Sequence, residues 1–128
     1  MVAMVLTERQ IDAGERLLKR LDECKLNVDA ALWFYFPDKE NWKLVLSLPD
    51  IVELGPKAGY KEVQRVLSHV EDPVGIELVD VVLARRNSEL LSLLKRAIKT
   101  GPGISRIRFS KNVINGRLID DALIYRLV

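Results

Sequence analysis

The chain has 128 residues, of which 48% are hydrophobic and 30% are charged. This length suits one domain with its own core, and the composition is too apolar for a disordered chain and too charged for a membrane protein. No apolar run reaches the roughly 18 residues of a transmembrane helix, so we expect no membrane contact. The only cysteine, Cys24, excludes an intramolecular disulfide, and no secretory leader is recognisable. Together these features predict a cytoplasmic location.

Charge is unevenly distributed along the chain. The net charge is +2, but residues 1–64 hold nine lysines and arginines against eleven acidic residues, whereas residues 65–128 hold eleven against seven. The excess is concentrated in residues 85–111, which hold eight cations and one acidic residue, Glu89. We expect this stretch to form a positive surface that attracts phosphate or carboxylate groups.

Residues 8–24 are predicted to form an amphipathic helix. Thr7 and Gln10 have the spacing of a capping box, in which the two side chains satisfy backbone N–H groups at the start of the helix. Apolar residues recur on one side of this helix, at Ile11, Leu17, Leu18, Leu21 and Cys24.

A hairpin is expected next. Residues 30–36 are aromatic and apolar on both faces, which predicts a strand that is covered on both sides. Residues 42–48 alternate apolar and polar side chains, which predicts a half-buried partner strand.

Three further elements are predicted in the middle of the chain. Pro56 suits the first position of a helix that extends to about residue 70. Residues 76–84 are β-branched and apolar on both faces, which is typical of a central strand. Ser88 suits the N-cap of a third helix, and Gly101 is its expected stop.

The C-terminal part is rich in strand signals. Residues 104–110 alternate, Asn115-Gly116 is typical of a type I′ hairpin turn, and a last strand is expected over 122–127. The element order reads α-β-β-α-β-α-β-β. It predicts a single α+β domain over residues 1–128, with a mixed or mostly antiparallel sheet of about five strands and about three helices.

Several catalytic and cofactor motifs are absent from the sequence. It contains neither a P-loop nor a dinucleotide-binding glycine pattern, and a redox Cys-x-x-Cys pair is also missing. The single histidine, His69, excludes the helical two-histidine zinc motif. We therefore expect no cofactor, no metal and no catalytic residue, with Cys24 a buried, unreactive thiol.

The candidate binding residues come from the basic segment. Helix, loop and strand follow one another there, so we expect its cations to gather near residues 101–103 and to contact phosphate or carboxylate groups. The candidates are Arg85, Arg86, Lys95, Arg96, Lys99, Arg106 and Arg108.

Asp80 is a second candidate. It lies in the predicted central strand, where a buried carboxylate needs a partner, and Arg106 or Arg108 could supply one. The aromatic residues 33–36 could stack on nucleic-acid bases, although core packing is their ordinary role.

Two functions remain open from the sequence. The leading hypothesis is a non-enzymatic interaction module that binds a macromolecule, either nucleic acid or an acidic protein surface, through residues 85–111. The alternative is a small enzyme or small-ligand-binding domain with a site around Asp80 and the nearby arginines. An exposed sheet edge or apolar patch would instead favour a homodimer.

Overall fold

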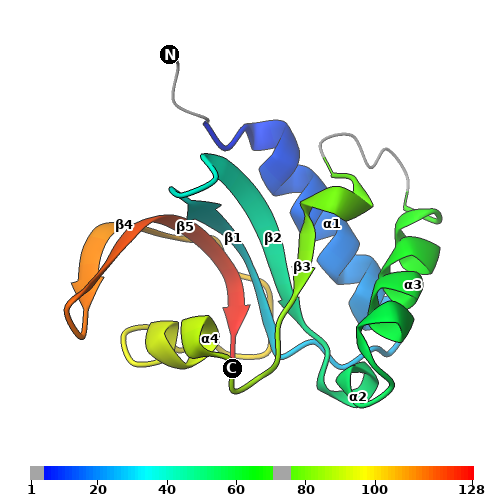
Figure 1. The fold of residues 1–128 in the computed structure, drawn as a ribbon. Helices are drawn as coiled ribbons and strands as arrows, with labels where there is room; N and C mark the ends of the chain where they lie inside the picture. Colours follow the sequence, from blue (N-terminus) through cyan, green and yellow to red (C-terminus); the bar gives the residue numbers. More distant parts are fainter. Residues whose placement is uncertain (1–4, 71–75) are drawn as a thin grey trace.

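The aromatic run of residues 30–36 forms the central strand of a five-stranded sheet. The computed structural model describes residues 5–70 and 76–128. In them the strands follow the order β3-β2-β1-β5-β4, with helices on both faces (Figure 1). The elements are α1 (Glu8–Glu23), β1 (Ala30–Phe36), β2 (Asn41–Ser47), α2 (Pro49–Val52), α3 (Pro56–Leu67), a 3₁₀ turn (Leu78–Asp80), β3 (Val81–Leu83), α4 (Glu89–Leu94), β4 (Ile107–Ile114) and β5 (Arg117–Leu127).

This arrangement confirms the predicted α+β class and the mixed sheet. Neighbouring strands pair antiparallel, except that β2 and β3 run parallel. The predicted capping box at the start of α1 is present, because the backbone N–H of Gln10 donates to Thr7 Oγ1 and Gln10 Oε1 accepts from the Thr7 N–H. The short helix α2, which has Pro49 at its first position, was not expected from the sequence.

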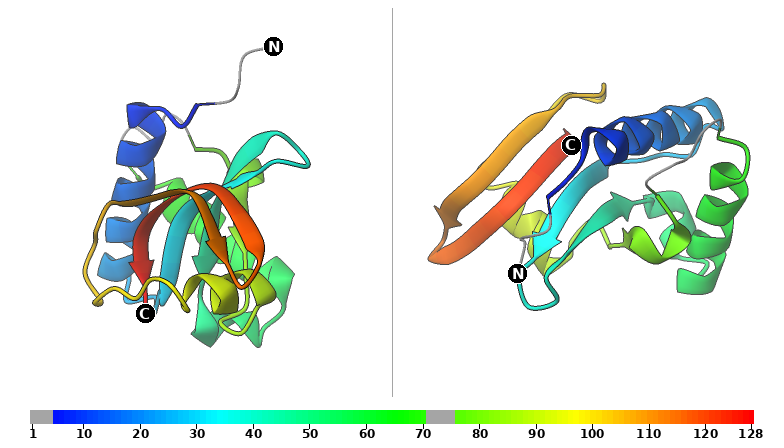
Figure 2. Two further views of the ribbon diagram at one scale, coloured as in Figure 1. Left: turned by 90° about the vertical axis from the view of Figure 1, so that its left-hand side faces the viewer. Right: turned by 90° about the horizontal axis from the view of Figure 1, so that it is seen from above.

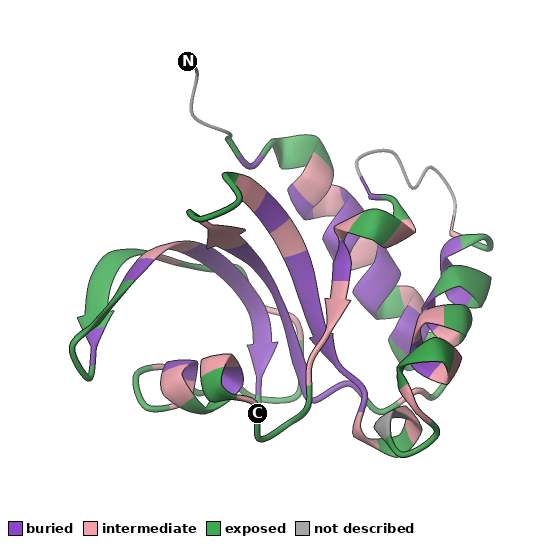
Figure 3. Cartoon of the chain, viewed as in Figure 1, coloured by how far each residue is buried: buried purple, intermediate pink, exposed green. Residues whose placement is uncertain are grey.

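Each face of the sheet carries its own apolar core. One core lies under α1 and α3 and includes Trp33 and Tyr125, and the other lies against α4 and includes Leu32 and Ile124; all four side chains are fully buried. Figure 3 shows that β1 and β5 are buried along most of their length. The prediction that residues 30–36 are covered on both sides is therefore confirmed.

The prediction of a central strand over 76–84 is wrong. Only residues 81–83 form a strand, and β3 lies at the edge of the sheet beside β2. Residues 78–80 form a 3₁₀ turn instead, in which the Asp80 carboxylate accepts a hydrogen bond of 2.9 Å from the Glu77 N–H. Such local side-chain hydrogen bonds compete with the backbone hydrogen bonds of a strand. The number of apolar residues in a segment does not reveal this competition.

The third predicted helix is shorter than expected. It begins at its N-cap, Ser88, whose hydroxyl accepts from the Leu91 N–H, but α4 ends at Leu94. Beyond it the chain passes through tight turns to Thr100, whose N–H donates to the carbonyl of Leu127 at 2.9 Å. The residues after Leu94, which were expected to continue the helix, are therefore bonded to the end of β5 instead.

The C-terminal hairpin is longer and more curved than its sequence signals indicate. Asn115 and Gly116 have φ angles of 51° and 78°, as the predicted type I′ turn requires. The last strand begins earlier than the expected residue 122, because β5 extends from Arg117 to Leu127. Lys111, with φ at 47°, interrupts the extended backbone of β4. Both strands bend around the sheet face that carries α4 (Figure 2).

The side chain of Tyr125 connects the sheet to α1. The register between β1 and β5 shifts there, since Ala31 pairs with Arg126 and Leu32 with Ile124, so Tyr125 is the extra residue of a bulge. Its buried hydroxyl donates to the carbonyl oxygen of Ile11 at 2.5 Å and accepts from Trp33 Nε1 at 3.0 Å.

Gly14 makes this contact with α1 possible. A Cβ atom at this position would lie 2.4 Å from Tyr125 Oη and 2.8 Å from Trp33 Nε1. A glycine in the middle of a helix ordinarily weakens it relative to alanine, so the close approach explains its presence.

Replacing Gly14 by alanine should lower the free energy of unfolding by about 1–3 kcal/mol, because the added methyl group overpacks the site and displaces buried hydrogen bonds. Urea denaturation measures the change. The matched control is Gly101→Ala, where a Cβ would meet nothing within 4 Å; its effect should stay below about 0.5 kcal/mol. A stabilised Gly14→Ala protein, as helix propensity alone predicts, would contradict the packing.

Alkaline pH should weaken the same contact. Burial raises the pKa of Tyr125 above its ordinary value, so folding favours the protonated hydroxyl. Its contribution is complete below about pH 10, where tyrosine ionises in the unfolded chain, and is lost as the pH rises further. Urea denaturation at increasing pH should show a steeper fall in stability for the native protein than for Tyr125→Phe. An equal fall in the stability of the two proteins would show that the Tyr125 hydroxyl does not contribute in this way.

Candidate functional site

Arg106 lies on the sheet face covered by α1, where it binds acidic residues of that helix. Its guanidinium lies 2.9 Å from Asp12 Oδ1, 3.0 Å from Glu15 Oε1 and 3.9 Å from Glu8 Oε2. The hydrogen bond to Asp12 raises the pKa of Arg106, and the bond to Glu15 adds to the effect. This cation therefore joins the segment before β4 to α1.

Arg108 lies on the same face and is also engaged. Its Nε lies 2.7 Å from Asp121 Oδ1, and its guanidinium carbon lies 5.5 Å from the centroid of the Trp42 ring. Burial alone would raise the pKa of Asp121, but the hydrogen bonds from Arg108 and Ser110 outweigh it, so the pKa falls below its usual value. Arg108 thus joins β4 to β5 through Asp121 and lies over the Trp42 ring of β2.

The cations of the basic segment consequently do not all lie on the same side of the sheet. Arg106 and Arg108 point to the α1 face, whereas their strand neighbours Ile107 and Phe109 lie opposite Ile124 and Ala122 of the α4 core. This is a direct result of strand alternation.

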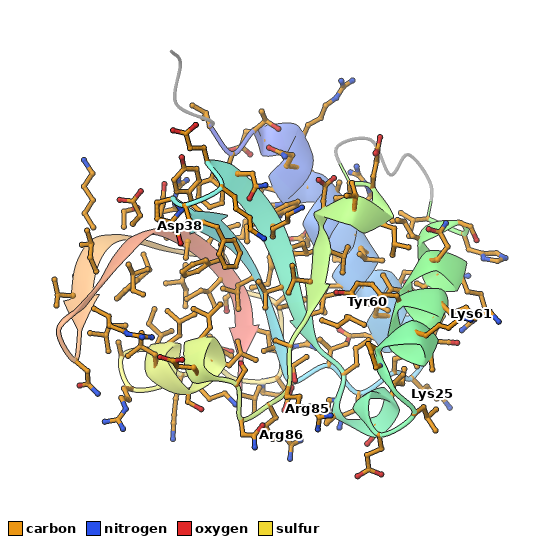
Figure 4. All side chains as sticks on the ribbon, in the orientation of Figure 1. Lys25, Asp38, Tyr60, Lys61, Arg85 and Arg86 are labelled. Carbon is orange, nitrogen blue, oxygen red and sulfur yellow. The ribbon has the colours of Figure 1, made fainter. Side chains whose placement is uncertain are left out.

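Three of the seven candidate cations, Arg86, Arg106 and Arg108, form ion pairs with described residues. Arg86 Nε donates to Asp29 Oδ2 at 2.6 Å. Among the residues that the structure describes, none forms an ion pair with the other four candidates, Arg85, Lys95, Arg96 and Lys99. Three of these four are exposed and Lys95 is partly buried. Figure 4 shows Arg85 and Arg86 close together just beyond the end of β3.

The expectation that Asp80 is a buried acid is wrong. Its side chain is half-buried at the end of the 3₁₀ turn, where it caps the Glu77 N–H. Arg106 and Arg108, its expected partners, bind carboxylates of α1 and β5 instead. Neither arginine therefore provides the partner for Asp80 that the alternative hypothesis expects.

An apolar groove lies between α4 and the start of β5. It has a volume of about 520 Å³, and α4 contributes Glu89, Leu90 and Leu93 to its wall. The remaining lining residues are Phe34 of β1 and Arg117, Leu118 and Ile119 of β5. Leu118 is 63% exposed, although it is a large hydrophobic residue.

A second, more polar hollow continues this groove. It has a volume of about 290 Å³, shares Glu89, Leu93 and Arg117 with the first, and adds Ser92, Arg96 and Asn115. The guanidinium of Arg117 pairs with the Glu89 carboxylate between the hairpin and α4. We call the two hollows together the α4 groove; it has an apolar end and a basic end.

Sequence reasoning found only part of the α4 groove. Arg96 belongs to the predicted basic surface, whereas Arg117 and Leu118 lie outside residues 85–111. The available signal was the pair of apolar residues that flank the turn, Val113 and Leu118, which face each other and are 65% and 63% exposed. An apolar pair next to a turn indicates a hairpin tip that is not covered by its own chain.

Other sequence candidates show no reactive arrangement. Cys24 is partly buried, and His69 is exposed with its Nδ1 2.8 Å from the carbonyl oxygen of Arg65. Within residues 5–70 and 76–128, no three His, Cys, Asp or Glu side chains are grouped to hold a metal ion. The helices in this part of the chain include none that is long and apolar enough to cross a bilayer.

Comparison with known proteins identifies no matching family model, no similar curated protein and no similar solved structure. A function for this chain has therefore to be inferred from its own geometry.

Replacing Arg106 by glutamine should lower the free energy of unfolding by about 1 kcal/mol at low ionic strength, because three carboxylates of α1 lose their shared cation. The loss should shrink in high salt, which screens exposed charges. Urea denaturation at two salt concentrations measures both effects. Arg96→Gln is the matched control and should leave stability unchanged; equal losses in both variants would show that Arg106 does not hold α1.

Proposed function

We propose that this protein is a non-enzymatic interaction module that binds a segment of another protein, rich in apolar and acidic side chains, in the α4 groove. The observation that carries the proposal is an open apolar groove with cations at one end.

The apolar end supports a protein partner. Leu90 and Leu93 are only partly buried although α4 is the helix that covers this face, and Leu118 adds further apolar surface. Apolar side chains of a docked segment would remove this surface from water, which stabilises association by about 25 cal/mol per Å² buried before the cost of ordering is subtracted.

The basic end supports an acidic partner. Among the residues that the structure describes, none forms an ion pair with Arg96, and only Glu89, whose side chain is 74% exposed, pairs with Arg117. An exposed ion pair contributes about 1 kcal/mol or less. A partner carboxylate can therefore replace Glu89 on Arg117 at little cost and bind Arg96 as well.

Nucleic acid is the less favoured partner. Two of the arginines expected to contact phosphates, Arg106 and Arg108, are engaged by carboxylates on the other face. The one aromatic ring in the groove lining, Phe34, is 8% exposed and offers little surface on which a base could stack.

A selection from a random peptide library tests the proposal. Peptides retained by the native protein should be enriched in Leu or Phe together with Asp or Glu, and counter-selection against Arg117→Gln should remove them. Fluorescence anisotropy of an enriched peptide should then show affinity about three- to tenfold lower for Arg96→Gln and Arg117→Gln, and a decrease with added salt.

Two matched variants serve as controls. Leu118→Ser should weaken peptide binding, whereas Val79→Ser, at an equally exposed position outside the groove, should not. Equal effects would contradict docking in the α4 groove. Enrichment of basic peptides, or tighter binding of single-stranded DNA than of any selected peptide, would overturn the choice of partner.

A further inference from the structure

A small, more enclosed cavity lies at the opposite end of the sheet order, beside β3. It has a volume of about 170 Å³. Its lining residues are Leu48, Gly55, Pro56, Gly59, Leu83, Ala84 and Arg85. These residues come from the end of β2, the start of α3 and the end of β3, so the cavity is separate from the α4 groove.

The topology places this cavity where sheets of parallel strands bind ligands. β2 and β3 are parallel neighbours, and α3 lies in the connection between them. Both strands end at the cavity, next to the first turn of α3. In open α/β sheets, ligands bind outside the carboxyl ends of the strands, and β2 and β3 reproduce that arrangement locally.

Two glycines line the cavity. A Cβ atom on Gly59 would lie 2.6 Å from Cδ1 of Leu83, which forms another part of the wall. Gly55 has a φ of 94°, a conformation that favours glycine, and a Cβ there would meet nothing within 4 Å. Larger residues at either position would fill space or strain the wall.

The wall on the β3 side is held in place by α3. Figure 4 shows Tyr60 on the side of α3 that faces β3. Tyr60 Oη accepts a hydrogen bond of 3.1 Å from the Leu83 N–H, on the edge of the sheet. This bond satisfies a backbone group that an edge strand would otherwise expose.

Arg85 gives the cavity a single charge. The lining contains no acidic side chain, and Arg85 forms no ion pair with any residue in the described part of the chain. Its neighbour Arg86 is bound to Asp29 at 2.6 Å and is not among the lining residues. Arg85 is thus the one charged residue among the lining residues named above, and its guanidinium is a group that binds carboxylates through two parallel hydrogen bonds.

We infer that this cavity binds a small monocarboxylate with an apolar body of about the size of a benzene ring, its carboxylate paired with Arg85. The size follows from the volume, since an apolar cavity of about 150 Å³ accommodates benzene. Such a group occurs in a free aromatic or branched acid and at the C-terminus of a peptide that ends in an apolar residue.

Titration of the ¹⁵N-labelled protein with phenylacetate tests this inference. The backbone amide signals of Gly55, Gly59 and Ala84 should shift and saturate, and Arg85→Gln should weaken binding about tenfold. Phenylacetamide, which lacks the charge, and acetate, which lacks the ring, should each bind at least about tenfold more weakly. A short peptide ending in phenylalanine, compared with its C-terminal amide, distinguishes the two sources of the ligand.

Variants outside the cavity provide the controls. Lys61→Gln changes an exposed cation of the same helix, and Arg117→Gln changes the α4 groove; both should bind phenylacetate like the native protein. Absence of saturable shifts, equal binding of phenylacetamide, or unchanged affinity in Arg85→Gln would overturn the inference. None of these outcomes bears on the α4 groove, because that site is tested with peptides and with different residues.

Discussion

The arrangement of this fold depends on the hydrogen bonds of the buried Tyr125 hydroxyl. A bulge in β5 turns this side chain toward α1, where its hydroxyl finds both an acceptor and a donor and where Gly14 leaves room for it. The contact fixes the helix on one face of the sheet. Its bond with Trp33 also adds to the pairing of β5 with β1, and the earlier part of β5 curves around α4 to form one wall of the α4 groove. Helix, central strands and groove are therefore coupled through one side chain.

The uneven charge of the sequence is largely compensated inside the molecule. The acidic N-terminal half supplies Glu8, Asp12 and Glu15 to Arg106, and it supplies Asp22 to the buried Arg126, whose guanidinium lies 2.8 Å from that carboxylate. These pairs cross from α1 to the C-terminal strands. Among the seven candidate cations, those without a described ion-pair partner lie in residues 85–99. The positive surface is thus smaller than the sequence count indicates, and it lies beside apolar hollows.

Local patterns predicted the elements better than they predicted the sites. The capping box, the amphipathic helix and the Asn115-Gly116 turn depend on neighbouring residues, so the sequence was sufficient for them. The strand over 76–84 failed because Asp80 forms a local cap that competes with pairing. The ion-pair partners of Arg106 and Arg108 depend on the sheet face on which these side chains lie, and hence on strand pairings between residues far apart in the chain. The groove and the cavity were missed for the same reason, as their walls come from separate elements.

The position of β5 in the sheet constrains when this chain can fold during its synthesis. β1, near the N-terminus, pairs on one side with β2 and on the other with β5, which is the last strand of the sequence. Until residues 117–127 have left the ribosome, β1 has an unpaired, apolar edge and α1 lacks its tyrosine anchor. The sheet can therefore be completed only after β5 has been synthesised, and until then the nascent chain exposes an apolar strand edge of the kind that promotes aggregation.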